Sequence, residues 1–364
     1  MTEHLPDTMQ ALVLVGPEQL AIQTVCRPDP GPMEVLCRVD TCYICGTDAH
    51  IIRGEHFGFW PKAYPFIPGH EWAGTIVALG ERTGDFGWRI GERVAGTSHA
   101  GCGYCRMCRT GRYNLCENFG NEALGHRQYG HYSPGAYADY VVHSVRSVIR
   151  VPESLPFAVA ALLDPASIAL HTVKRGILSP GDTVAILGPG PMGLMAQLCA
   201  QALGAGRVIM VGHGYRLALA ARLGAETVDF TQVDPVAAVR ALAPNGADVV
   251  IECAGMPTTL AQAINMVRKG GHVSVIGIPL EPASLPIQKL VLEEIDLHGV
   301  RANRGTCEEV LPLLVNRRID PRPLITHTFP LSAFAEALAT FVGRRDGALK
   351  VAVRPDAVCD GEQA

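Results

Sequence analysis

The sequence predicts an α/β protein with two domains, one built mainly of antiparallel strands and one built around a parallel, doubly wound sheet. Three observations carry this prediction. The chain has 364 residues, more than a single hydrophobic core usually organises. Up to about residue 151, short β-rich runs alternate with glycine and proline. From about residue 160, strands alternate with helices, which is typical of a parallel sheet.

The β-rich runs of the first part lack a helical period, so a compact and mostly antiparallel β domain is expected. They lie at residues 11–15, 35–39, 74–78 and 136–142. In the second part, strands are predicted at 183–187, 207–211, 227–229, 248–252, 272–276 and 295–300. A tail with helices near 308–315 and 331–341 and a strand at 349–353 follows, and it could return to the first domain.

Composition narrows the classes of partner. The formal net charge is −4 and no basic block is present, so nucleic acid is not an expected partner. The first ten residues resemble no signal or transit peptide, and no run of about 18 apolar residues occurs, so no membrane association is expected. We therefore expect a cytoplasmic protein, in which most of the twelve cysteines are metal ligands or buried thiols.

Two short motifs bring together a cysteine, a histidine and a carboxylate. Residues 45–50 read Cys-Gly-Thr-Asp-Ala-His, and residues 68–71 read Pro-Gly-His-Glu. A thiolate, an imidazole and a carboxylate are ligands that zinc takes readily. The motifs predict a catalytic zinc that polarises an alcohol or a carbonyl, with Thr47 and His50 close enough to Cys45 to carry a proton away.

Four further cysteines form a second motif within residues 101–116. Their spacing suits one tetrahedral metal site, whereas the iron–sulfur run of ferredoxins has its fourth cysteine after three residues, followed by proline. Here seven residues precede the fourth cysteine and Glu117 follows it. Unliganded thiols are the remaining alternative. Since all four positions would be protein ligands, we predict a structural zinc held by Cys102, Cys105, Cys108 and Cys116.

A glycine-rich loop follows the predicted strand at 183–187 and opens a helix. It reads Gly188-Pro-Gly-Pro-Met-Gly193. In this context the first glycine permits a tight turn, Gly190 lets the backbone approach a pyrophosphate, and Gly193 lets the helix pack on the strand. The loop, including Pro191 and Met192, is predicted to bind a dinucleotide at the helix N-terminus.

The position that would hold the adenosine ribose lacks its usual carboxylate. About 20 residues beyond the loop, such sites carry an acidic residue that binds the ribose 2′-hydroxyl, but here the residue is Gly212. His213 and Arg216 could instead face a 2′-phosphate, which favours NADP over NAD. The alternative is that Arg216 is an ordinary exposed helix residue.

In order and spacing, these motifs resemble the zinc-dependent alcohol dehydrogenases of the medium-chain dehydrogenase/reductase family. The resemblance covers residues 10–353 and includes Glu252-Cys-Ala-Gly255. It is closest to the branch of sorbitol, butanediol and threonine dehydrogenases, in which a carboxylate and a proline precede the cofactor domain, as Asp164 and Pro165 do here. It implies a GroES-like domain formed by residues 1–160 and 305–364, a Rossmann domain at 161–304, and a dimer or tetramer.

The resemblance also implies the ligands of the catalytic zinc. Cys45 and His70 would bind the metal, and Glu71 would be a ligand or its near neighbour, exchanging with water or substrate. Asp164 matches the position of the remaining protein ligand. An aspartate followed by proline is equally a good start for a helix, so Asp164 could instead be a helix cap.

Three further roles follow from the resemblance. Thr47 would take the proton of the substrate hydroxyl, and His50 would carry it toward solvent. Asp48 would hydrogen-bond an imidazole that ligates zinc, as such ligands usually require. His50 could also be a surface histidine beside a turn.

The implied activity is zinc-dependent hydride transfer between NAD(P) and a secondary alcohol such as a polyol, a diol or an amino alcohol. The aromatic residues of the loop at 51–66 could form a wall over the substrate or pack into the core. If these aromatic residues line the substrate pocket, they favour an alternative activity, that of an NADPH-dependent carbonyl reductase or of a dehydrogenase for a bulkier apolar or cyclic alcohol. A third hypothesis is a dinucleotide-binding sensor without catalysis, although it would have no use for a proton path.

Overall fold

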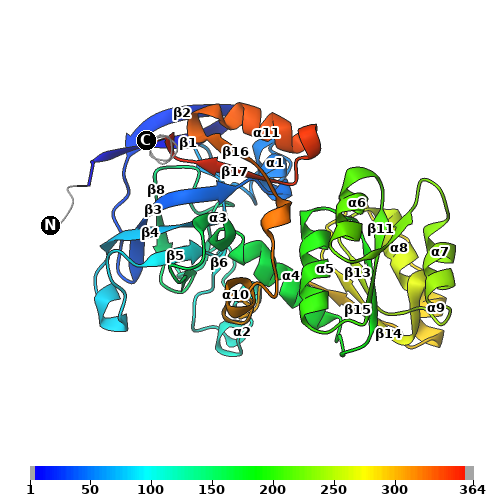
Figure 1. The fold of residues 1–364 in the computed structure, drawn as a ribbon. Coiled ribbons are helices and arrows are strands. Elements are labelled where there is room, and N and C mark those ends of the chain that lie inside the picture. Colours follow the sequence, from blue (N-terminus) through cyan, green and yellow to red (C-terminus); the bar gives the residue numbers. More distant parts are fainter. Residues whose placement is uncertain (1–4, 357–364) are drawn as a thin grey trace. The chain divides into compact units, whose positions relative to one another are not determined.

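The computed structural model describes residues 5–356, which form two compact units (Figure 1). The first unit combines the described residues up to Asp164 with those from Ile325 onward, and the second comprises Pro165–Leu324. Residues 1–4 and 357–364, which belong to the predicted GroES-like domain, lie outside the described part of the chain. The first unit is therefore built from both ends of the sequence.

The first unit is organised around a seven-stranded sheet with the order β16-β17-β3-β4-β5-β9, in which β8 also pairs with β3. Only β16 and β17 run parallel; the other pairs are antiparallel. The strands are β3 (Glu34–Tyr43), β4 (Glu71–Leu79), β5 (Arg93–Gly96), β8 (Tyr140–Ser144), β9 (Val148–Arg150), β16 (Ile325–Pro330) and β17 (Lys350–Arg354).

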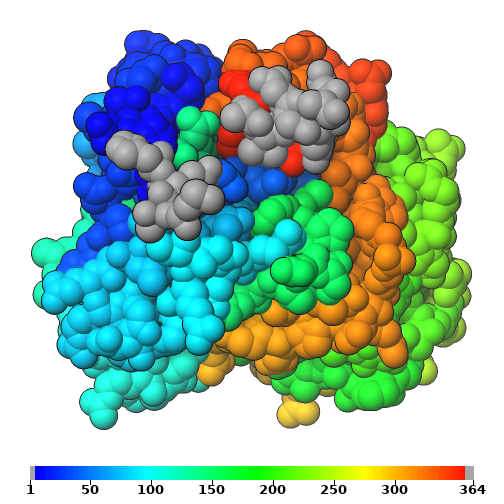
Figure 2. Space-filling model, turned by 60° about the vertical axis from the view of Figure 1, so that its left-hand side comes forward, coloured from blue at the N-terminus to red at the C-terminus, as the bar shows by residue number. Residues whose placement is uncertain are grey.

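The C-terminal strand β17 completes this sheet beside β3, with Ala352 opposite Tyr43 and Val353 opposite Cys42. Figure 2 shows blue segments from the early part of the chain and orange and red segments from its late part on the same face of the molecule. Strand pairing across more than 300 residues thus places β17 next to the end of β3, just before the turn that carries Cys45.

Shorter elements surround the sheet. A hairpin is formed by β1 (Thr8–Gly16) and β2 (Gln19–Cys26), and a small ladder by β6 (His99–Ala100) and β7 (Arg127–Gln128). The helices are α1 (Gly46–Ile52), α2 (Arg106–Arg109), α3 (Phe157–Ala160) and α11 (Phe334–Val342), with 3-10 turns at Thr83–Phe86, Tyr113–Leu115, Leu331–Ala333 and Arg345–Gly347.

The core of the first unit contains large rings whose polar atoms are bonded. Trp72 is fully buried, and its indole N–H lies 3.1 Å from Nε2 of His143. A Cβ at Gly96 would lie 2.1 Å from Nε1 of Trp72, so only glycine fits opposite this ring. Tyr137 and Phe334 meet in a T-shaped contact with centroids 4.8 Å apart. This packing fixes β4, which carries site residues at its start.

The second unit is a six-stranded parallel sheet with the order β12-β11-β10-β13-β14-β15. This is the 3-2-1-4-5-6 order of doubly wound folds, which bind ligands where the strand order reverses. The strands are β10 (Thr183–Leu187), β11 (Arg207–Gly212), β12 (Glu226–Asp229), β13 (Ala247–Glu252), β14 (Val267–Val275) and β15 (Asp296–Gly299).

Helices link these strands in the second unit. Their facing surfaces bury an apolar core around residues such as Ile209, Val250 and Val273, as expected for a parallel sheet covered on both sides. The helices are α4 (Leu163–Arg175), which begins at the end of the first unit, α5 (Pro191–Ala202), α6 (Gly214–Arg222), α7 (Pro235–Leu242), α8 (Pro257–Met266), α9 (Ile287–Leu292) and α10 (Cys307–Val315), with a 3-10 turn at Arg322–Leu324.

The predicted α/β class, with a mostly antiparallel domain and a doubly wound sheet, is confirmed. One predicted strand is wrong in part, because the run at 136–142 enters a strand only at Tyr140. Its first residues bond to another loop instead: the amides of Ala136 and Tyr137 donate to the carbonyls of Gly69 and Pro68 over 2.9 and 3.1 Å. This segment therefore supports the turn that carries His70.

Candidate active site

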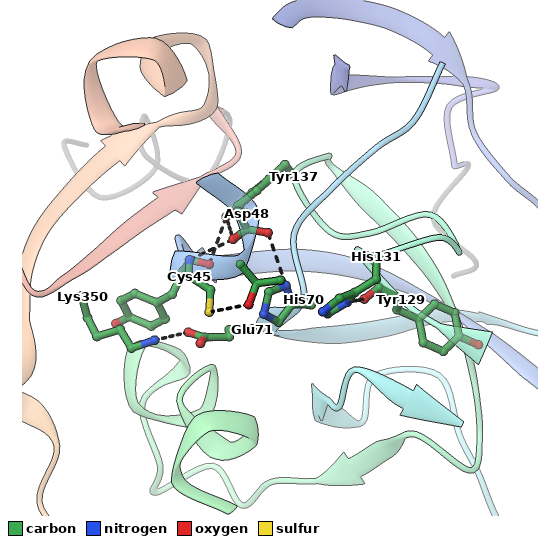
Figure 3. A network of polar contacts seen from close by, with 10 residues as sticks. Cys45, Asp48, His70, Glu71, Tyr129, His131, Tyr137 and Lys350 are labelled. Carbon is green, nitrogen blue, oxygen red and sulfur yellow. Dashed lines mark hydrogen bonds and ion pairs between the residues drawn. The ribbon is translucent and has the colours of Figure 1, made fainter. Parts of the chain in front are cut away.

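Cys45 lies in the turn between β3 and α1, where a capping box fixes its backbone. Cys45 is the N-cap residue, and its amide donates to Oδ2 of Asp48 over 2.8 Å. Asp48 is fully buried, and the Tyr137 hydroxyl donates to the same oxygen over 2.7 Å. The Cys-x-x-Asp spacing thus forms this turn through local hydrogen bonds, and it holds the thiol at the helix start (Figure 3).

His70 and Glu71 lie where the chain enters β4. Gly69, just before them, has φ +99°, and a Cβ there would lie 2.9 Å from Tyr137. Glycine is therefore required by both the backbone conformation and the space. In this way the Pro-Gly-His-Glu motif turns two adjacent side chains toward Cys45.

These residues form one potential metal group. One ligand atom each from Cys45, His70 and Glu71 lies within 4.8 Å of the others. Both His70 and Glu71 are buried. A sulfur, a nitrogen and a carboxylate oxygen that converge below the surface fit zinc, which takes all three ligand types.

Asp48 supports His70 from behind. Its Oδ1 lies 3.3 Å from Nδ1 of His70, and both atoms are buried. Burial disfavours the carboxylate, but attraction to His70 and the hydrogen bonds from Cys45 and Tyr137 outweigh it and lower the pKa of Asp48. Asp48 thus stays ionised and orients the imidazole, as a carboxylate behind a metal-bound histidine does.

A buried lysine that the sequence analysis missed lies against Glu71. Nζ of Lys350, at the start of β17, forms an ion pair with Oε2 of Glu71, and the two side chains are only 3% and 4% exposed (Figure 3). Burial alone would lower the pKa of Lys350, but attraction to Glu71 and Cys45 raises it. The sequence did offer a signal for this contact, because Lys350 lies within the apolar run 349–353 and a buried lysine needs a partner of opposite charge.

The predicted proton-relay residues lie apart. The Thr47 hydroxyl is 3.9 Å from Sγ of Cys45. His50 is about a third exposed at the other end of α1 and contacts Glu55 and Arg53. Within residues 5–356, no hydrogen bond joins Thr47 directly to His50.

Asp164 is buried in the first turn of α4, with 1% of its surface exposed. Among the described residues, the potential metal group around Cys45 does not include it. The structure thus brings together three of the four predicted ligands and keeps the fourth on a separate helix.

The ring of His131, also missed from the sequence, packs against His70. Their centroids are 4.5 Å apart, and a carbonyl contact of 2.9 Å with Tyr129 orients His131 (Figure 3). Trp60, from the aromatic loop, meets His131 edge-on at 4.8 Å. In the aromatic loop at 51–66, Phe66 is buried in the core, whereas Phe57 and Phe59 are at least half exposed. Packing into the core therefore describes only part of the loop, and so does a wall over the substrate.

The four-cysteine motif forms a second potential metal group. The sulfur atoms of Cys102, Cys105, Cys108 and Cys116 lie within 4.8 Å of one another. Backbone amides point at them: those of Cys102, Cys105 and Cys108 donate to sulfur over 3.4 Å. Burial opposes ionisation, yet amides from Cys105 and Tyr104 lower the pKa of Cys102 to about 6. Burial raises the pKa of Cys108 and Cys116, so their ionisation would depend on a bound cation. Four converging sulfur atoms fit a closed tetrahedral zinc site.

In the second unit, the glycine loop leaves β10 and starts α5 at Pro191, with Gly190 as N-cap. Gly188 has φ +98°, and a Cβ on Gly193 would lie 1.9 Å from the Gly188 carbonyl oxygen. By contrast, a Cβ on Gly190 would meet a single neighbouring atom, Nη1 of Arg216 at 4.0 Å. The loop is thus tightly packed on the sheet side and open at the helix start, which fits a pyrophosphate.

Gly212 lies at the end of β11, where the structure explains why no carboxylate is present. A Cβ at this position would lie 2.3 Å from Cγ of Pro189, a ring that cannot rotate away. His213 packs edge-on against Phe230 at 5.0 Å, and Nε of Arg216 lies 2.9 Å from the Tyr215 hydroxyl. An aspartate at 212 would displace the glycine loop itself.

Two family models match the chain: an alcohol dehydrogenase GroES-like domain over residues 31–153 and a zinc-binding dehydrogenase over 191–316. A sorbitol dehydrogenase from Bacillus subtilis is 33% identical over 98% of this chain and 100% of its own length. An L-threonine 3-dehydrogenase from Deinococcus deserti is 32% identical over 88% of this chain and 92% of its own length. The structure of a zinc-binding dehydrogenase from Sinorhizobium meliloti, solved with NADP, matches with a TM-score of 0.87 and 30% sequence identity. The match covers 96% of this chain and 100% of that one.

The fold, the donor sets and these matches define a zinc-dependent alcohol dehydrogenase. The chain belongs to the medium-chain dehydrogenase/reductase family, in the branch of the sorbitol and threonine dehydrogenases. The predicted resemblance, the enzyme class and its dependence on zinc and NAD(P) are thus confirmed, which decides against a sensor without catalysis. None of the helices in the described residues has the length and apolar character needed to cross a membrane.

Proposed function

We propose that this enzyme oxidises a secondary alcohol with a neighbouring hydroxyl or amino group, such as a polyol, a vicinal diol or an amino alcohol, and reduces NADP in preference to NAD. The observation that carries the reaction type is the buried group of Cys45, His70 and Glu71. The substrate class is supported by the relatives named for sorbitol and for L-threonine.

In this proposal Cys45 and His70 hold the catalytic zinc, and Glu71 is a ligand or its near neighbour. Asp164 would be the remaining ligand. A bound zinc supplies Lewis acidity, which lowers the pKa of an alcohol hydroxyl. A second zinc is held by Cys102, Cys105, Cys108 and Cys116, where all four positions are filled and no chemistry occurs.

Residues of the chain transfer the proton and bind the dinucleotide. Thr47 takes the proton of the substrate hydroxyl. His50, at the solvent-accessible end of α1, carries the proton on toward solvent, and a bridging group must connect the two because no hydrogen bond in the described part of the chain joins them directly. Glu55 assists, because hydrogen bonds from Arg53 and His50 lower its pKa to about 2 and keep it as an acceptor. The glycine loop 188–193 binds the pyrophosphate of the dinucleotide, whose own chemistry is to accept the hydride.

Assembly is the last element of the proposal. Several apolar side chains after β14 are exposed, including Ile278, Leu280, Val291 and Leu292, each at least 64% exposed. Exposed apolar side chains favour burial against another copy of the chain. We propose a homo-oligomer, a dimer or a tetramer.

The substrate class is tested by relative kcat/KM over a panel of secondary alcohols with each dinucleotide. A polyol, vicinal diol or amino alcohol is expected to be the best substrate. The second candidate is a dehydrogenase or NADPH-dependent carbonyl reductase for bulky cyclic or apolar substrates, favoured by the ring contacts from His70 through His131 to Trp60. Higher kcat/KM for cyclic alcohols or their ketones would establish that candidate instead.

The cofactor preference is tested by Arg216→Ala. The variant is expected to lose about 10- to 100-fold in affinity for NADP and little for NAD, because a charged hydrogen bond to phosphate contributes about 1.5–3 kcal/mol. Arg222→Ala, at the far end of the same helix α6, is the matched control. If the NADP-to-NAD ratio is the same in Arg216→Ala as in the control, Arg216 does not contact a 2′-phosphate.

A further inference from the structure

A third cluster of metal-binding side chains lies on the edge of the second unit's sheet. His272 is on β14, and Asp296 and His298 are on the edge strand β15. In the parallel register, His272 lies opposite Asp296 and Ser274 lies opposite His298. Since side chains two residues apart on a strand point to the same face, all four project from one face of the sheet.

The donor atoms of this cluster converge. One ligand atom from each of His272, Asp296 and His298 lies within 4.8 Å of the others. Nδ1 of His272 is 3.3 Å from Oδ2 of Asp296. The two imidazole rings are near parallel, with centroids 5.8 Å apart and planes at 28°. The cluster shares no residue with the two potential zinc groups described above.

Several polar atoms of the cluster are buried without a hydrogen-bond partner. They are Nε2 of His298 and Oγ of Ser274, which is fully buried, and Nδ1 of His272, whose one contact named above is the ion pair with Asp296. Leaving a buried polar atom without a hydrogen bond is destabilising, so native structures rarely leave several together. A ligand that accepts lone pairs from two imidazole nitrogens would satisfy them at once.

We propose that His272, Asp296 and His298 form a third site, which binds a divalent transition metal such as Zn²⁺ and clamps the edge strand β15 to β14. Two histidines and one carboxylate are a common donor set for such ions. Tetrahedral zinc needs donor atoms about 3.3 Å apart, so the group must contract. Asp296 has room to do so, because its side chain is 62% exposed.

The surrounding charges are compatible with one bound cation. Arg175, at the end of α4, exerts a positive potential on His298, and Asp296 opposes it. Two imidazoles and one carboxylate therefore form a site open to solvent on the side of Asp296. The role assigned to the metal is structural, since it bridges two adjacent strands. Strands β13 and β14 separate β15 from β10, the strand that leads into the dinucleotide loop.

The test is the number of bound zinc ions per chain, measured by elemental analysis after equilibrium dialysis against about 10 µM free Zn²⁺. The wild type is expected to hold one equivalent more than the His272→Gln/His298→Gln double variant. His327→Gln, which removes an exposed histidine of the first unit, is the matched control and should hold as much as the wild type. Equal zinc in wild type and double variant would overturn the proposal.

A second measurement guards against a misfolded variant. Asp296→Asn removes only an exposed carboxylate, so the chain should fold, yet its third equivalent should dissociate at least tenfold more readily. Added Ni²⁺ is expected to raise the melting temperature of the wild type more than that of Asp296→Asn. Identical Ni²⁺-induced shifts would contradict the site whatever the enzyme's substrate proves to be, because neither readout depends on activity.

Discussion

Cys45→Ser is expected to reduce turnover by at least about a thousandfold, because loss of metal charge stabilisation amounts to several kcal/mol and each 1.36 kcal/mol is a factor of ten. Serine keeps the size of the side chain but offers zinc no thiolate. The amide of residue 45 can still donate to Asp48, so the turn should survive. Dinucleotide binding, which depends on the second unit, should be unchanged.

Turnover, zinc content and NADP affinity of the Cys45→Ser variant are measured on the same preparation. Zinc should fall by one equivalent, while the metal of the four-cysteine motif is retained. Cys26→Ser, at an exposed thiol of β2, is the matched control and should behave as the wild type. A fully active Cys45→Ser enzyme would remove this residue from the catalytic zinc site.

Lys350→Met is expected to destabilise the first unit by about 3–5 kcal/mol, the usual cost of leaving one charge of a buried ion pair alone. Methionine conserves most of the volume but leaves Glu71 without its cation beside Cys45. Turnover should also fall, because the carboxylate is then free to occupy the position that the substrate needs. Denaturant unfolding monitored by tryptophan fluorescence measures the first effect, because all three tryptophans lie in the first unit.

The matched comparison is a double-mutant cycle with Glu71→Gln. The double variant should be more stable than Lys350→Met alone, since no buried charge is left unpaired. The pKa of Lys350 is raised, so the contribution of the pair is complete below the ordinary lysine value of about 10.4 and is lost only as the pH rises beyond it. Additive effects of the two substitutions at pH 7 would show that the ion pair contributes nothing.

The sequence predicted those parts of the site whose geometry is local. The turn around Cys45 depends on a hydrogen bond to Asp48 three residues away, and the glycine loop depends on the backbone of six consecutive residues. The four cysteines likewise lie within fifteen residues of one another. In each case the spacing along the sequence alone restricts how the side chains or backbone groups can be arranged, so the motif is enough to predict that part of the site.

Contacts between distant segments could not be predicted in this way. Lys350 reaches Glu71 across 279 residues, and only the pairing of β17 with β3 brings it there. The steric conflict between residue 212 and Pro189 likewise depends on how a loop packs on a neighbouring strand. The run at 136–142 has the composition of a strand, but its first residues bond to the loop before His70.

The most direct test of zinc-dependent hydride transfer is the absorbance near 340 nm, where reduced nicotinamide absorbs, followed with a polyol or diol before and after removal of the metal. The wild type should reduce NADP at a steady rate, lose that rate when a chelator strips the zinc that we propose to bind at Cys45 and His70, and regain it when Zn²⁺ is restored. A rate that persists in protein shown by elemental analysis to contain no zinc would contradict the account.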